Sequence, residues 1–231
     1  MQVLVIIPAR GGSKGIPNKN IRPLLGKPLL KYTIDAAKEI FEDERIIIST
    51  DSQKIRAVAE DSGLTVPFLR PVELSTDTAG SYEVILHAMG YAKSAGIAFD
   101  TIVLLQPTSP LRTSEHIRQA LAIYDPSLDM VVSVKESDEN PYYSLFEEDN
   151  SGFLEKSKPG FYTRRQDCPK VYAYNGAIYV MNVNSLIKKS ISHFTMIRKF
   201  VMNSMDSIDI DTPLDWKITE MILSERLGRG A

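Results

Sequence analysis

Val3-Leu4-Val5-Ile6-Ile7-Pro8 forms a short apolar run near the start of the chain, and ARGGSKGIPNKN (Ala9–Asn20) follows it directly. The apolar run predicts a buried β-strand, because continuous apolar side chains suit a strand that is covered on both faces. The second stretch combines paired glycines with spaced cations, which suits a loop that binds a polyanion such as a triphosphate. Together they predict a strand whose carboxyl end carries an anion site.

Positive charge is concentrated in the first 31 residues, where no acidic residue occurs before Asp35. The cations of this region are Arg10, Lys14, Lys19, Arg22, Lys27 and Lys31. The whole chain has a formal charge of −2 and a pI near 6.0, which argues against general nucleic-acid binding. Neither a signal peptide nor a run of about 20 apolar residues is visible, so we expect a cytoplasmic protein without a membrane partner. The single Cys168 excludes an internal disulfide and a multi-cysteine zinc site.

Apolar runs that favour strands alternate with segments of helical periodicity. The expected strands are Val3–Ile7, Arg45–Ser49, Val66–Leu69, Thr101–Leu105, Met130–Val134, Ala177–Met181 and Ile197–Met202. The expected helices are Leu29–Ile40, Gln53–Ser62, Ser81–Ala95, Ser114–Tyr124 and Leu214–Leu227, the last with Thr212 as N-cap and Asp215 in a capping box. This order predicts one α/β domain over residues 1–231, with a Rossmann-like, doubly wound and mostly parallel sheet. Its ligands should lie beyond the carboxyl ends of the strands.

Residues 136–174 interrupt this alternation with aromatic residues, charges and weak periodicity. The segment predicts a hairpin-like arm inserted in the domain. An aromatic-rich arm needs a surface that covers it, and a second subunit is the expected cover. We therefore expect a homodimer.

Two common phosphate-binding loops do not fit the sequence. No window between Gly11 and Gly26 matches G-x-x-x-x-G-K-[ST], which excludes the P-loop. Gly11, Gly12 and Gly15 have the wrong spacing for the dinucleotide fingerprint G-x-G-x-x-G. The loop therefore belongs to another class of phosphate-binding loop.

Together with five later blocks, the Ala9–Asn20 loop resembles the acylneuraminate cytidylyltransferases, the CMP-sialic acid synthetase family. These blocks are IISTD (Ile47–Asp51), LRPVELSTDTA (Leu69–Ala79), LLQPTSPLRT (Leu104–Thr113), NGAIY (Asn175–Tyr179) and SIDIDT (Ser207–Thr212). The resemblance covers nearly the entire chain. It implies the nucleotide-diphosphosugar transferase fold and a nucleotidyltransferase that uses CTP.

The resemblance assigns the nucleotide site to the first loop and to two later positions. The residues it implies are Ala9, Arg10, Gly11, Gly12, Lys14, Lys19, Asn20, Arg70 and Ser81. The cations of the loop would contact the CTP phosphates, Asn20 the ribose, and Arg70 with the Ser81 region the cytosine. We expect Arg10 and Lys19 to be catalytic, because they would stabilise the charge on the departing pyrophosphate.

Asp209 and Asp211 form the candidate metal site. Two acids at positions i and i+2 of an extended segment point to the same side, and hard carboxylate oxygens suit Mg²⁺, or Mn²⁺ in its place. The alternative role, capping of the last helix, is already filled by Thr212. The resemblance also makes these two acids metal ligands, so we expect both to be catalytic.

The sugar-binding candidates are Gln106, Arg165 and Tyr179. Gln106 offers a donor and an acceptor, which suits a polyhydroxylated sugar. By resemblance, Tyr179 faces the sugar and the arm lends Arg165 to an active site, of its own subunit or of its partner. Arg112 leaves two roles open, since it could bind a carboxylate or brace its loop through an ion pair.

The expected reaction transfers CMP from CTP to the anomeric hydroxyl of a nine-carbon α-keto sugar acid, an N-acylneuraminate or a close relative. Legionaminic and pseudaminic acid are alternative acceptors, and Kdo is less favoured. Departures from typical sialic acid synthetases at Tyr143, Ala173-Tyr174 and Phe194 leave the acceptor open. Transfer to a sugar 1-phosphate would need a second cation cluster. An inactive nucleotide-binding module would lack Lys19, Asp209 or Asp211, and all three are present.

Overall fold

A computed structural model of the chain describes residues 1–12, 15–76 and 80–228. Its centre is a six-stranded sheet in the order β10-β6-β9-β5-β1-β4. The strands are β1 (Val3–Pro8), β4 (Ile46–Ser49), β5 (Thr101–Leu105), β6 (Met130–Glu136), β9 (Tyr172–Asn182) and β10 (Ile197–Val201). Only β9 runs antiparallel to its neighbours β5 and β6, and the other described pairs of this sheet are parallel. The predicted α/β fold with a mostly parallel sheet is confirmed.

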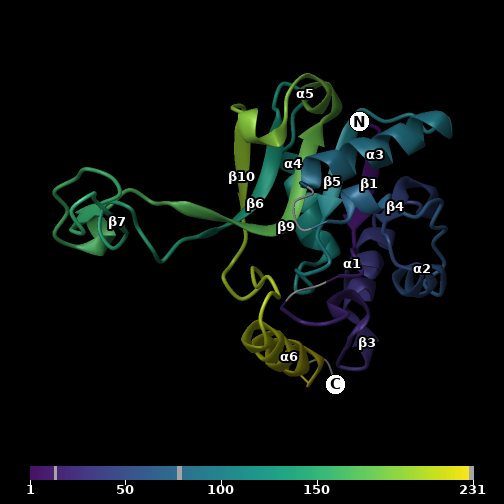
Figure 1. Ribbon diagram of the computed structural model, residues 1–231, viewed down its shortest axis with the longest axis horizontal. Helices are drawn as coiled ribbons and strands as arrows, with labels where there is room; N and C mark the ends of the chain where they lie inside the picture. The colour runs from purple at the N-terminus through teal and green to yellow at the C-terminus, as the bar shows by residue number, and fades with distance from the viewer. Residues whose placement is uncertain (13–14, 77–79, 229–231) are drawn as a thin grey trace.

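Helices cover both faces of the sheet (Figure 1). One face packs against α1 (Leu29–Lys38), α2 (Gln53–Glu60) and α4 (Ser114–Ile123), and the other packs against α3 (Ser81–Ser94) and α5 (Val183–Lys188). The strands are apolar on both sides, as in β5, where all five residues are buried. This burial explains why the strands read as continuous apolar runs.

A third, smaller core joins the two ends of the chain. The last helix, α6 (Pro213–Gly228), packs Trp216 against Ile16, Leu24 and Leu29, together with Ile210. The Arg22 guanidinium lies 4.9 Å from the centre of the Trp216 ring. The predicted capping box is present at the start of α6: the Asp215 amide donates to Thr212 Oγ1, and the Thr212 amide donates to Asp215 Oδ2.

The remaining elements are short. They are β2 (Pro23–Leu24), β3 (Lys27–Pro28), β7 (Phe146–Glu148), β8 (Leu154–Lys156), and the 3₁₀ turns η1 (Lys19–Ile21), η2 (Asp43–Arg45), η3 (Val72–Leu74), η4 (Arg165–Asp167) and η5 (Ile191–His193). Of the described helices, none is long and apolar enough to cross a bilayer.

Two expectations about elements need correction, and one helix was not expected. Val66–Leu69 is not a strand: the segment contains Pro67, which has no N–H to donate to a neighbouring strand. β9 starts at Tyr172, so residues 172–174 belong to the central sheet rather than to the inserted segment. The six-residue α5 has no counterpart among the predicted helices.

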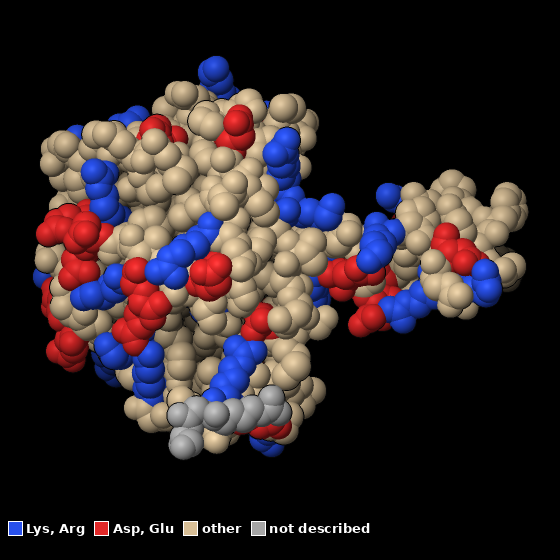
Figure 2. Space-filling model, turned by 180° about the vertical axis from the view of Figure 1, so that it is seen from behind, with Lys and Arg blue, Asp and Glu red and all other residues tan. Residues whose placement is uncertain are grey.

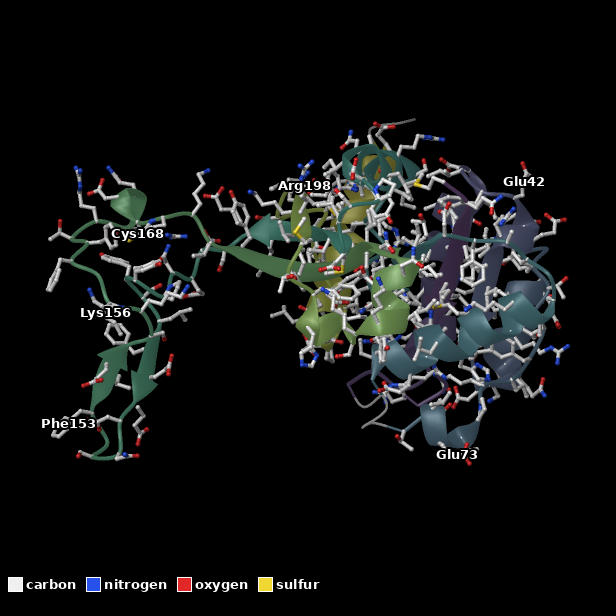
Figure 3. The ribbon with its side chains drawn as sticks, turned by 90° about the horizontal axis from the view of Figure 1, so that it is seen from above. Glu42, Glu73, Phe153, Lys156, Cys168 and Arg198 are labelled. Atoms are coloured by element: carbon white, nitrogen blue, oxygen red, sulfur yellow. The ribbon has the colours of Figure 1, made fainter. Side chains whose placement is uncertain are left out.

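Between β6 and β9 the chain leaves the body as an arm (Figure 1). Its outer part is the β7–β8 hairpin, in which Phe146 pairs with Lys156. Figure 2 shows the arm standing clear of the body, and Figure 3 places Phe153 at its far end. Side chains of Phe153, Leu154 and Phe161 are exposed along it.

Candidate active site

The main cavity has a volume of about 570 Å³ and opens beyond the carboxyl ends of β1 and β5. This is the edge at which an α/β sheet binds its ligands. The predicted site residues that line it are Arg10, Lys19, Asn20, Arg70, Ser81, Gln106, Asp209 and Asp211. Lys19 and Asp211, which are 192 positions apart in the sequence, therefore meet in one cavity.

Lys19 is held in place by the segment that carries the two acids. Its side chain is only 11% exposed, and its Nζ donates to the Ile210 carbonyl and lies 3.0 Å from Asp211 Oδ1. Asn20, the next residue, donates from Nδ2 to the Arg10 carbonyl at 3.0 Å. Its buried Oδ1 has no hydrogen-bond partner among the described residues, so it is an acceptor available to a ligand.

Asp51 organises the first loop from the end of β4. Its Oδ1 accepts a hydrogen bond from the Gly11 amide at 2.8 Å and lies 3.9 Å from the Arg70 guanidinium. The Arg70 Nε donates to Ser75 Oγ at 3.2 Å. Burial lowers the pKa of Arg70, Asp51 partly opposes this shift, and the charge of Arg10 adds to it. Arg70 is thus fixed as a buried cation at the cavity wall.

Part of the predicted phosphate loop does not line the cavity. Ala9 is buried and its amide donates to the Ser49 carbonyl, while the Gly11 amide is used by Asp51. Gly12 is also absent from the cavity lining, and Lys14 lies outside the described residues. Gly15 has a different reason to be glycine: a Cβ there would lie 2.2 Å from the Asp211 carbonyl oxygen. The loop therefore packs directly on the backbone of the acidic segment.

Asp209 and Asp211 differ in their surroundings. Asp211 is exposed, whereas Asp209 is partly buried, and its buried Oδ1 has no hydrogen-bond partner among the described residues. Burial raises the pKa of Asp209; a hydrogen bond from Thr108 lowers it, the charge of Asp211 raises it and Lys19 lowers it. The nearby Asp206 is turned away, toward Arg226 of α6, Asn203 and His116.

Gly176 brings Gln106 and Asp209 to the same point. It adopts a φ of +74°, which a glycine adopts without strain. A Cβ at this position would lie 3.2 Å from Asp209 Oδ2 and 3.4 Å from Gln106 Oε1. The missing Cβ of Gly176 therefore leaves room for both side chains, that of Gln106 directly after β5 and that of Asp209 on the acidic segment.

The buried Arg112 side chain holds the backbone next to Gln106 and Gly176 in place. It is 2% exposed and donates to the carbonyls of Gln106 and Ala177, both at 3.1 Å, and to Thr33 Oγ1 at 2.6 Å. Burial lowers its pKa to about 9, so it stays protonated at neutral pH. No ion pair joins it to a carboxylate of the described residues. Arg112 therefore does brace its loop, as one of the two predicted roles required. It does so through hydrogen bonds to carbonyls, so the predicted ion pair is wrong.

Comparison with known proteins decides the family. Residues 4–222 match the family model described as Cytidylyltransferase. The chain belongs to the cytidylyltransferase family. It is therefore a nucleotidyltransferase, and the predicted family resemblance is confirmed.

This cytidylyltransferase is similar to bacterial enzymes over nearly its full length. It is 38% identical to the CMP-N,N'-diacetyllegionaminic acid synthase of Legionella pneumophila, over 96% of this chain and 97% of that protein. It is 35% identical to the N-acylneuraminate cytidylyltransferase of Escherichia coli, over 97% of this chain and 53% of that longer protein. The solved structure of a CMP:2-keto-3-deoxy-manno-octonic acid synthetase, complexed with CTP, superposes with a TM-score of 0.72 at 17% identity, over 98% of this chain and all of the other. That likeness supports the fold.

Two predicted sugar-binding residues of this cytidylyltransferase do not line the main cavity. Tyr179 lies on β9 opposite Leu104 and Val132, and its ring centre is 6.3 Å from that of Tyr174. Burial raises the pKa of Tyr179, and the charge of Asp209 raises it further. Arg165 lies on the arm, is exposed, and forms an ion pair with Asp138. Their roles toward a sugar stay predictions.

Sequence reasoning missed Asp51 and Gly176 as site residues, and it preferred Gln106 to Thr108, which also lines the cavity. Each lay inside a block that carries the family resemblance, but its contacts are long-range. Asp51 lies two residues after a buried strand, so an acid beyond the carboxyl end of a strand was the available signal. Gly176 gave no such signal, because a positive φ cannot be read from one sequence.

Proposed function

We propose that this cytidylyltransferase transfers CMP from CTP to the anomeric hydroxyl of a nine-carbon α-keto sugar acid. The hydroxyl oxygen forms a bond to the α-phosphorus, the bond from that phosphorus to the bridging oxygen of the β-phosphate breaks, and pyrophosphate leaves. The hydroxyl proton is released. Named relatives support this acceptor class, because they act on diacetyllegionaminic acid, N-acylneuraminate or, at 31% identity, pseudaminic acid.

One observation carries the proposal: the cation loop and the Asp209–Asp211 segment lie against each other and line one cavity. Lys19 and Arg10 would neutralise the phosphates and stabilise the charge on the departing pyrophosphate. The unpartnered Oδ1 of Asn20 suits a ribose hydroxyl, and Arg70 with Ser81 suits the cytosine end. Gln106, next to Asp209, would hold a hydroxyl of the acceptor.

The two carboxylates fit a divalent cation. Asp209 Oδ1 is buried and unpartnered, and no group of three or more His, Cys, Asp or Glu side chains in the described residues forms a metal site of its own. Mg²⁺ suits such a pair, since it is held by one or two carboxylates and completed by phosphates and water. We propose Asp209 and Asp211 as its ligands, with Mn²⁺ as a substitute. When bound, the ion would offset phosphate charge and lower the pKa of the acceptor hydroxyl.

We also propose that the protein works as a homodimer in the cytoplasm, where its arm covers a second subunit. The exposed Phe153, Leu154 and Phe161 favour burial against a partner. Arg165 could then reach the site of the other subunit, because its own arm stands clear of the body (Figure 2).

The test of the proposed reaction is pyrophosphate release from CTP and Mg²⁺ with Neu5Ac, legionaminate, pseudaminate or Kdo as acceptor. We expect release with at least one of the three nine-carbon acids and less with Kdo. Absence of release with all three nine-carbon acids would overturn the proposal.

Asp211→Asn tests the metal pair within the same assay. We expect kcat to fall at least about 100-fold, because the variant loses one charged metal ligand while keeping its shape. Asp61→Asn removes an exposed acid at the end of α2 and is the matched control, with activity close to that of the unaltered protein. Near-normal activity of Asp211→Asn, with an unchanged melting temperature, would refute the ligand role.

A further inference from the structure

β9 contains a bulge where it passes the active site. Val132 of β6 pairs with Tyr179, and Val134 pairs with Tyr174. Residues 175–178 of β9 therefore lie opposite Ser133 alone, and Gly176 lies inside this bulge with its positive φ. Bulges of this kind re-aim backbone and side chains next to active sites.

The Asn175 side chain holds the bulge together. It is 4% exposed, and its Oδ1 accepts hydrogen bonds from Ser133 Oγ at 2.6 Å and from the Ala177 amide at 3.2 Å. Ser133 Oγ in turn accepts from the Ile178 amide at 2.8 Å. The side-chain amide of Asn175 thus supplies hydrogen bonds where the bulge interrupts the backbone hydrogen bonds between β6 and β9.

The other end of the same side chain reaches the acidic segment. Asn175 Nδ2 donates to Ser207 Oγ at 2.9 Å, and Ser207 Oγ donates to the Asn203 carbonyl at 2.6 Å. Ser207 is 3% exposed and lies two residues before Asp209. One buried amide therefore connects β6, the bulge of β9 and the segment that carries the candidate metal ligands.

We propose that Asn175 is a positioning residue that sets the place of the Asp209 carboxylate. Asn175 precedes Gly176, where a Cβ would lie 3.2 Å from Asp209 Oδ2, and its own side chain donates to Ser207, two residues before Asp209. Asn175 is thereby linked to the surroundings of Asp209 in two ways: its side chain holds Ser207, and its backbone leads into Gly176. Partners in the second layer around a metal typically change its affinity, or the activity, by 10- to 100-fold when they are removed.

The chemistry requires an amide rather than a carboxylate at this position. A carboxylate could still accept from Ser133 and from the Ala177 amide, but it could not donate to Ser207. The Ser207 hydroxyl has one hydrogen, which it already gives to the Asn203 carbonyl. Asn175→Asp would therefore place an oxygen against an oxygen and add negative charge beside Asp209.

The experiment measures Mn²⁺ affinity in the presence of CTP by water-proton relaxation, for the unaltered protein and for Asn175→Ala, Asn175→Asp and Ser207→Ala. We expect the Kd for Mn²⁺ to rise at least tenfold in both Asn175 variants and severalfold in Ser207→Ala. A second measurement, pyrophosphate release with CTP and a sugar acid, rests on the proposed function. In that assay we expect the kcat of both Asn175 variants to fall at least tenfold, while their KM for CTP changes less than threefold.

Asn182→Ala is the matched control. Asn182 is the other asparagine of β9; it caps α5 by accepting from the Asn184 and Ser185 amides, remote from the acidic segment. Its loss should lower the melting temperature and leave the Kd for Mn²⁺ unchanged. If Asn175→Ala does not fold, Ser207→Ala tests the same link with a smaller change.

Unchanged Mn²⁺ affinity in both Asn175→Asp and Ser207→Ala would overturn the proposal, as would an equal loss of affinity in Asn182→Ala. An unaltered protein that binds no Mn²⁺ with CTP would overturn it as well. An unaltered protein that binds Mn²⁺ with CTP but turns over no sugar acid would refute the proposed reaction alone, since the affinity measurements still decide the role of Asn175.

Discussion

Main-chain carbonyls hold two of the buried cations beside the active site. Lys19 donates to the Ile210 carbonyl, and Arg112 donates to the carbonyls of Gln106 and Ala177. A carbonyl dipole orients a cation without cancelling its charge, whereas a carboxylate partner would cancel it. Lys19 also meets Asp211, but that acid is 74% exposed, so solvent weakens the pairing. Net positive charge therefore stays available for a phosphate.

Arg112→Met tests the brace under Gln106. The variant leaves the Gln106 and Ala177 carbonyls without their donor, and each unsatisfied buried group costs about 1–3 kcal/mol. We expect the free energy of unfolding to fall by about 2–4 kcal/mol and KM for the sugar acid to rise. Urea unfolding and steady-state kinetics measure both. Arg118→Met, at a half-exposed arginine of α4, is the control and should change the free energy of unfolding by less than about 0.5 kcal/mol. Equal effects in the two variants would contradict the brace.

Site residues that act through local patterns could be predicted, and those that act through long-range contacts could not. Asp209 and Asp211 were predicted because their i, i+2 spacing is visible in the sequence. Their contact with Lys19 spans 192 residues and depends on the packing of Ile16 against Ile210 and Trp216. The exclusion of Ala9 and Gly11 from the cavity likewise follows from contacts with Ser49 and Asp51, which belong to another strand.

Among the elements, β9 differs most from its prediction. Its apolar centre predicted a strand, but an apolar run does not record direction, so the antiparallel course of β9 could not be read from it. The missed helix α5 follows β9 directly and has only six residues, too few for a helical period to be recognised. The position of α5 is set instead by hydrogen bonds to Asp129, the residue that precedes β6.

Asp129, the residue before β6, joins α5 and β10 to the sheet. Its carboxylate accepts from Ser185 Oγ at 2.7 Å, Lys189 Nζ at 2.8 Å, and the amides of Thr195 and Met196 at 2.9 and 3.0 Å. Burial raises the pKa of Asp129, but these hydrogen bonds outweigh it and hold the pKa well below its usual range. The charged form is therefore the one that stabilises the fold.

Asp129→Asn should lower the free energy of unfolding by about 2–4 kcal/mol at pH 7, because the buried acceptor loses its charge. A pKa lowered in the folded state gives stability that is present above the unfolded pKa, near 3.8, and is lost as the pH falls below it. The difference between the variant and the unaltered protein should therefore shrink below about pH 4. Urea unfolding at pH 7, 5 and 3 measures it. A difference that stays constant with pH would contradict the charge-based role.

At the scale of the whole molecule, the arm exposes apolar side chains that the body of the same chain does not cover (Figure 2). It carries exposed aromatic and aliphatic side chains away from the core, and ion pairs such as Lys170–Glu136 hold its base. Figure 3 places Phe153, Lys156 and Cys168 on this arm, away from the body. Such a surface gains stability only when another surface covers it.

We expect the unaltered protein to sediment as a dimer and Phe153→Ser with Phe161→Ser to shift it toward the monomer. Both side chains are exposed in the single chain, so their loss should leave its folding intact. Analytical ultracentrifugation measures the mass, and circular dichroism checks the fold. Met221→Ser replaces an exposed apolar residue of α6 and is the control on the body. A monomeric unaltered protein at the concentration of the assay would contradict the dimer.

The contact between Lys19 and Asp211 also has a consequence for synthesis. The 192 positions between them take about 10–40 s to translate at a typical rate of about 5–20 residues per second. During that interval the emerging chain carries the cation loop without its acidic partner. A message cut short before the codon for Asp209 would yield a protein with most of the sheet and no candidate metal ligands. The acidic side of the cavity is therefore added only after all six strands of the central sheet have been translated.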